Sequence, residues 1–204
     1  MKNIFRPIWV GENYENSGIF DKRVLVIAES TYNEEGKDTS QYNLSMAEDH
    51  IYFYKNNEPI KMWLRYRERL VKACLNKQLL SINDVERFWH SIAFFIFVEE
   101  TLPGSGVRPT EKQWQNHRPI VEVVEKYEPD LIILTGCELF DWWIANKPIN
   151  VTEYEKVCGA RREQTYKYVS KAGKVTKIYG MRHPTFCSPQ YEYSFLKSAG
   201  VKLK

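Results

Sequence analysis

The amino-acid sequence predicts an α/β protein on the strength of two features. Three continuous apolar runs, 24–28, 92–98 and 131–136, are typical of strands that are buried on both faces. Between them stand longer segments whose apolar residues recur at helical spacing. Strands that alternate with helices imply right-handed crossovers and a parallel sheet. We therefore expect three layers, α/β/α, with a mostly parallel central sheet of roughly four strands.

The first half of the chain supplies one strand and two helices. The run VLVIA is followed by a loop-like stretch, ESTYNEEGKDTS. Helices are then predicted over residues 44–55 and 60–76, because turn formers separate these two segments. The second helix carries an apolar stripe with spacings of three or four residues. We interpret the side chains of that stripe as core: Met62, Tyr66, Leu70 and Ala73.

In the second half, a short helix over 82–90 leads into the second strand and then into a Gly- and Pro-rich loop, EETLPGSGVRP. Thr110, with Gln113 three residues later, has the pattern of a capping box and opens the longest predicted helix. The strand LIILTG and the helix ELFDWWIA follow. YKYVS and VTKIY then form a β-like pair, and the helix QYEYSFLKSAG closes the fold, with Gly200 as its C-cap.

Length and composition narrow the function classes. The chain has 204 residues, which fits one domain spanning residues 1–204. No apolar run approaches the ~20 residues of a membrane helix, and the start of the chain lacks a signal-peptide pattern, so we expect a cytoplasmic protein with no membrane partner. The four cysteines lie far apart without a CxxC pair, so we expect no metal and no cofactor.

Positive charge is concentrated at one end of the sequence. Residues 154–204 hold 11 Lys and Arg against 3 Asp and Glu, although the whole chain has a net charge of only +3. Such asymmetry indicates a partner that carries phosphates, or else a solvated basic face.

Four polar segments are expected to meet in one pocket. Ligands of open parallel sheets bind beyond the carboxyl ends of the strands. The segments that follow the predicted strands are ESTY, EETLPGSGVRP, TGCE and RHPTFCSP. In this order and spacing, the chain from Arg23 to Gly200 resembles the uracil-DNA glycosylase superfamily. The most specific element of that resemblance is the motif that begins with His183 and Pro184.

The resemblance implies a flipped-base mechanism that breaks an N-glycosidic bond in DNA, single-stranded or with a flipped base. His183 would donate a hydrogen bond to the departing base. At the position of the family's aspartate stands Ser30, with Glu29 one residue earlier, so either Glu29 takes the carboxylate role or that role is absent. Tyr32 matches the tyrosine that restricts which base fits.

The remaining expected contacts concern the base and the DNA backbone. Ile96 stands where the family reads uracil with an asparagine, so Glu99 or Glu100 would read an exocyclic amine or another ring instead. Phe186 or Cys187 would fill the space that the flipped base leaves. The residues expected to contact phosphates are Arg108, Arg161, Arg162, Arg182 and Ser188.

Three functions remain open at this point: a base-excision glycosylase, a non-catalytic nucleic-acid or nucleotide binder with the same fold, and a hydrolase of small nucleosides.

Overall fold

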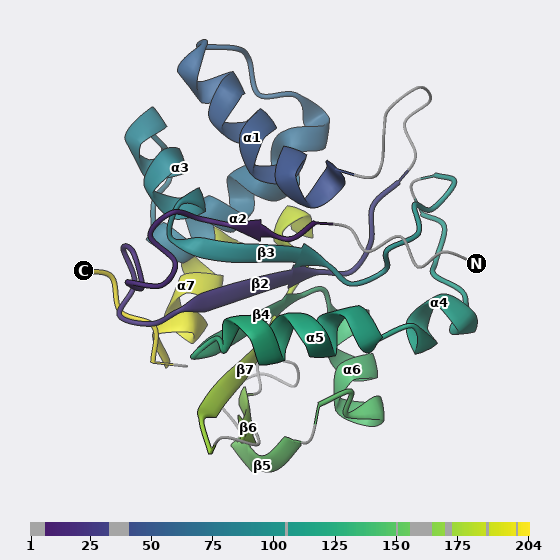
Figure 1. Cartoon of the computed structure of the whole chain (residues 1–204). Coiled ribbons are helices and arrows are strands. Elements are labelled where there is room, and N and C mark those ends of the chain that lie inside the picture. The colour runs from purple at the N-terminus through teal and green to yellow at the C-terminus, as the bar shows by residue number, and fades with distance from the viewer. Residues whose placement is uncertain are drawn as a thin grey trace.

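A single mixed sheet forms the centre of the protein (Figure 1). The computed structural model describes residues 7–32, 41–104, 106–149, 151–155, 165–169, 173–186, 188–198 and 200–204. Within them, seven strands are ordered β1-β3-β2-β4-β7-β6-β5. Their bounds are β1 Trp9–Val10, β2 Val24–Ala28, β3 Ile92–Ile96, β4 Leu131–Thr135, β5 Val151–Glu155, β6 Thr165–Val169 and β7 Val175–Met181. The predicted α/β class is confirmed.

The prediction of roughly four strands describes only the parallel centre of the sheet. Strands β3, β2, β4 and β7 run parallel to one another. Strand β1 is antiparallel to β3 at one edge, and β6 and β5 extend the other edge in antiparallel fashion. Strand β1 has only two residues and β5 is polar, so neither shows the long apolar run that identifies a buried strand. The predicted β6–β7 pair is confirmed.

The helices follow the expected order with two corrections. They are α1 Tyr42–Lys55, α2 Arg65–Leu75, α3 Ile82–Trp89, α4 Glu111–Gln115, α5 Arg118–Tyr127, α6 Cys137–Asn146 and α7 Pro189–Ser198, with 3₁₀ turns η2 Met62–Leu64 and η3 Pro184–Phe186. The helix predicted over 60–76 begins only at Arg65, and Met62, which was expected in the core, is 75% exposed in a 3₁₀ turn that precedes it. The capping box of Thr110 and Gln113 is present. The single long helix predicted after it is wrong, because the chain leaves helical geometry at Asn116. Helix α5 then starts afresh, and Pro119 lies in its first turn, where no backbone donor is required.

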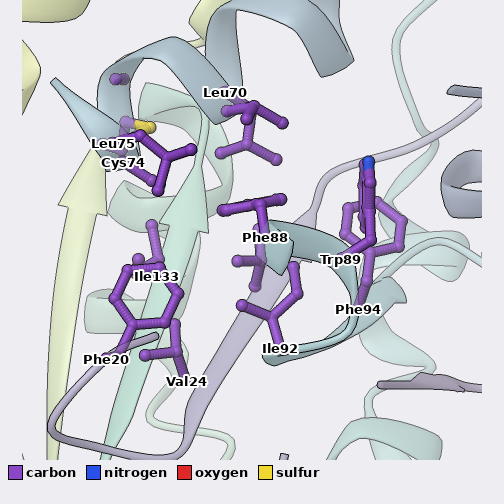
Figure 2. Packing of buried hydrophobic residues seen from close by; sticks show 14 of the residues in the cluster. Phe20, Val24, Leu70, Cys74, Leu75, Phe88, Trp89, Ile92, Phe94 and Ile133 are labelled. Carbon is purple, nitrogen blue, oxygen red and sulfur yellow. The ribbon is translucent and has the colours of Figure 1, made fainter. Parts of the chain in front are cut away.

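Alternate side chains of the strands enter two separate hydrophobic clusters. Val24 and Val26 of β2 pack on the side covered by α1, α2, α3 and α7. Leu25 and Ile27 point to the side covered by α5 and α6. Figure 2 shows the first cluster, in which Phe88 of α3 lies near Ile92 of β3, and Leu70 and Cys74 of α2 lie above the sheet.

The two clusters lie on opposite faces of the sheet. The carboxyl ends of the parallel strands form one edge of the sheet between the two helical layers. In the part of the chain that the structure describes, no helix has the length and apolar character needed to cross a membrane.

Candidate active site

Two neighbouring strands bring Glu29 and Gly136 together at the carboxyl edge of the sheet. Glu29 directly follows β2, and Gly136 directly follows β4, which lies between β2 and β7. A β-carbon added to Gly136 would lie only 3.7 Å from Glu29 Oε2, and its φ of +120° is one that glycine adopts readily. The Gly136 N–H also donates to the carbonyl of Met181 at the end of β7, 2.9 Å away. Residues at the ends of three adjacent strands therefore meet here.

Glu29 shares a guanidinium with a second carboxylate. Arg108 Nη1 lies 3.6 Å from Glu29 Oε1, and Arg108 Nη2 lies 3.0 Å from Glu138 Oε1. The Glu29 side chain is only 14% exposed, whereas that of Arg108 is 65% exposed. Burial raises the pKa of Glu29, the nearby Glu138 raises it further, and Arg108 opposes both effects. Glu29 is thus a largely buried carboxylate whose protonation depends on two charged neighbours.

His183 follows β7 by two residues and has a defined tautomer. Its Nδ1 accepts a hydrogen bond from the backbone N–H of Thr185 over 3.3 Å, so in the neutral ring the proton sits on Nε2. Burial lowers the pKa of His183, and the charge of Arg108 lowers it further. The ring is therefore a neutral N–H donor near pH 7, and Arg108 acts electrostatically on both Glu29 and His183.

Tyr66 of α2 is a site residue that the sequence interpretation assigned to the core. Its ring lies 5.3 Å from the His183 ring, and its hydroxyl lies 2.6 Å from Thr135 Oγ1 at the end of β4. Thr135 donates its own proton to the carbonyl of Ile27, so Tyr66 is the donor in the bond between the two hydroxyls. Burial raises the pKa of Tyr66, which keeps that donor protonated. Tyr66 thus contacts His183 through its ring and the end of β4 through its hydroxyl.

The segment that follows β2 continues alongside the loop that follows β3. Leu102 N–H donates to the Thr31 carbonyl at 2.9 Å, and Tyr32 forms a parallel bridge with Leu102. Ser30 is half-buried, and 38% of Tyr32 is exposed. Both residues therefore follow Glu29 on the same edge of the sheet.

Ile96 does not reach the surface of this edge. It is the last residue of β3, only 1% exposed, and packs in the cluster beneath α1 and α2. Its backbone N–H donates to Oδ1 of Asn43, a buried residue of α1, over 2.9 Å. The side chain of Ile96 therefore belongs to the core of the protein.

Glu99 and Glu100 have partners on the α4 side of the loop. Asn116 Nδ2 donates to Glu99 Oε2 at 3.5 Å, and Gln113 Nε2 donates to Glu100 Oε2 at 2.8 Å. Their expected role in reading a base stays a prediction.

The motif after β7 presents one ring prominently to solvent. Phe186 is 83% exposed, and its ring centroid lies 5.5 Å from that of His183. Arg182 is exposed, with its guanidinium 5.0 Å from the centre of the Tyr191 ring. Ser188 is exposed just before α7. Three further predicted residues lie outside the described ranges: Cys187, Arg161 and Arg162.

Within the described ranges, no group of three or more His, Cys, Asp or Glu side chains is arranged to hold a metal ion. Sequence comparison adds no assignment: no model of a known protein family matches this chain, and no curated protein matches it.

The arrangement can support acid–base and electrostatic chemistry. A buried carboxylate at one strand end can orient a water molecule or balance a developing positive charge. A neutral imidazole two strands away can donate to a developing anion. Sequence analysis identified Glu29 and His183 because each follows a predicted strand and matches a motif of the family that the chain resembles. It missed Tyr66, which lies in a helical segment whose spacing indicates only packing, and it assigned no role to Glu138, although Glu138 belongs to the segment TGCE that was expected at the pocket.

Proposed function

We propose that the protein hydrolyses the N-glycosidic bond of a base in DNA and is a divergent relative of the uracil-DNA glycosylases. One observation carries the proposal: a buried carboxylate, Glu29, and a neutral histidine, His183, lie on the same strand edge and are both influenced by Arg108. The order of the motifs along the chain and the parallel centre of the sheet support the family relationship. The expected location of this activity is the cytoplasm.

In the proposed reaction, a water molecule adds its hydroxyl to C1′ of the sugar while the carbon–nitrogen bond to the base breaks. Glu29, ionised, orients that water and stabilises the positive charge that develops on the sugar. His183 donates its Nε2 proton in a hydrogen bond to the base, which leaves with the bonding electron pair and takes up the remaining proton of the water. Phe186, with its exposed ring, occupies the gap in the base stack.

The test is a base-release assay. Oligonucleotides that carry uracil, hypoxanthine, xanthine or an alkylated base are incubated with the protein, and abasic sites are detected by alkaline cleavage. We expect release of at least one of these bases and its loss in His183→Ala.

Glu48→Gln serves as the matched control, because Glu48 is an exposed carboxylate of α1. This variant should retain wild-type release. Failure to release any base would refute the glycosylase proposal, and salt-dependent binding without release would favour the non-catalytic binder.

A further inference from the structure

A basic hollow lies between α2 and α7, outside the carboxyl edge that holds Glu29. Its volume is about 500 Å³, within the range of ligand sites in proteins. Four side chains of α2 line it at positions i, i+3, i+4 and i+7, which places them on one face of the helix. The start of α7 forms the opposite wall. The lining residues that matter here are Arg65, Glu68, Arg69, Lys72, Ser188 and Pro189.

The one carboxylate among these residues is committed to other partners. Glu68 accepts hydrogen bonds from Lys72 at 2.8 Å, from the Tyr54 hydroxyl at 2.8 Å and from His50 Nε2 at 3.3 Å. Burial opposes its ionisation, but the hydrogen bonds from His50, Lys72 and Tyr54 outweigh burial and lower the pKa of Glu68 to about 2. Glu68 therefore stays ionised and neutralises Lys72.

Two arginines keep their positive charge toward the hollow. Arg69 Nη1 donates to the carbonyl of Thr185 at 2.6 Å, a neutral acceptor. Arg65 is exposed at the start of α2 and has no carboxylate partner within the described part of the chain. Guanidinium groups donate in a planar fork that matches phosphate oxygens. The hollow is thus suited to a phosphate group.

The hollow adjoins the motif after β7. Arg69 contacts Thr185, which lies between His183 and the exposed Phe186, and Ser188 lies two residues beyond Phe186. An exposed aromatic ring beside a basic surface is the combination with which proteins hold unpaired nucleic-acid strands, since bases stack on the ring while cations track the backbone. This juxtaposition favours a polynucleotide over a free phosphate.

We propose that the α2–α7 hollow binds a backbone phosphate of the DNA strand whose base reaches His183. The inference rests on the proposed function for the identity of the strand. The proposed binding site itself is supported by the two arginines and the hollow, which do not depend on that function.

Fluorescence anisotropy with a labelled, unmodified single-stranded DNA oligonucleotide tests this site at several salt concentrations. Arg65→Glu should weaken binding about tenfold or more and lower the slope of log Kd against log salt by about 1, because one phosphate contact is lost. Lys126→Glu is the matched control, because it makes the same charge change at an exposed position of α5 on the opposite face of the sheet. It should change Kd less than twofold. Arg65→Gln should show an intermediate loss.

Equal effects of Arg65→Glu and Lys126→Glu, or no effect of either, would overturn the inference. Inorganic phosphate is the second arm: displacement of the oligonucleotide by millimolar phosphate at constant ionic strength would assign the hollow to a free anion instead. Base release separates the two proposals. Selective weakening by Arg65→Glu without base release by the wild type would leave this inference standing and refute the glycosylase proposal. Base release by the wild type together with normal DNA binding by Arg65→Glu would support the glycosylase proposal and refute this inference.

Discussion

Arg108→Ala should shift two pKa values in the same direction. The guanidinium contacts Glu29 and favours its ionised form, so its removal should raise the pKa of Glu29 further above the ordinary range. It also disfavours the protonated form of His183, so the same substitution should raise the pKa of His183 toward its ordinary value. A rise in the pKa of both groups would show that Glu29 and His183 form one electrostatically coupled site.

The magnitude follows from the geometry of the Arg108–Glu29 pair. The closest nitrogen and oxygen atoms are 3.6 Å apart, and Arg108 is 65% exposed. Unit charges at this distance interact by about 1 kcal/mol under the screening of water, and pairs with an exposed partner are typically worth ~0.2–1 kcal/mol. Because one pKa unit corresponds to about 1.4 kcal/mol, the pKa of Glu29 should rise by about half a unit.

NMR titration of the Glu29 carboxyl and the histidine rings measures both shifts. The chain has four histidines, so His183→Gln assigns the relevant resonance. Glu138→Gln is the matched control and should lower the pKa of Glu29, because it removes a like charge and leaves Arg108 in place. If Arg108→Ala left both pKa values unchanged, Glu29 and His183 would not form one electrostatic site.

Three further outcomes concern stability and the exposed ring. Burial lowers the pKa of His50 and of His183, so the unfolded chain binds more protons below about pH 6.5. The free energy of unfolding, measured with urea, should therefore fall from pH 7.5 to 5.5 by at most about 1.4 kcal/mol per unit for each histidine, and His50→Gln should flatten this slope. Gly180→Ala should destabilise the protein by about 1–3 kcal/mol in urea unfolding, because the new β-carbon would lie 2.4 Å from the buried Phe140 ring. Gly104→Ala, with no neighbour within 4 Å, should stay within about 0.5 kcal/mol, and equal effects would contradict the packing. Phe186→Ala should leave the urea midpoint unchanged because the ring is 83% exposed, yet weaken oligonucleotide binding in the anisotropy assay; unchanged binding would argue against a DNA contact.

The parallel centre of the sheet could be predicted because β2, β3 and β4 are buried on both faces, which produces continuous apolar runs. The outer strands β1 and β5 could not be predicted in this way. Strand β1 spans two residues, and the side chains of β5 carry no apolar run. The long helix predicted after Thr110 ends at Asn116 in the structure. Local helix propensity does not determine where the chain must turn to pack against the rest of the protein.

The candidate site was predictable only where it depends on strand ends. Glu29 and His183 follow predicted strands and match motifs of the resembled family, and the carboxyl ends of parallel strands meet at one edge of the sheet. Tyr66 has helical spacing with core residues, so its hydroxyl contact with Thr135 becomes visible only when α2 packs on the sheet. The motif resemblance placed Ile96 in the site. Ile96 is, however, the last residue of β3, and its side chain faces a helical layer and packs in the core.

Glu29, the proposed reacting carboxylate of the edge site, and Glu138 lie on either side of Arg108 and allow a matched test. Glu29 is 14% exposed and Glu138 is 52% exposed, and both contact the same guanidinium. Single-turnover base release should slow by about 100-fold or more in Glu29→Gln, because the neutral amide would no longer orient the water as an anion or stabilise the positive charge on the sugar. It should change only a few-fold in Glu138→Gln. Equal rates in the wild type and Glu29→Gln would contradict the account.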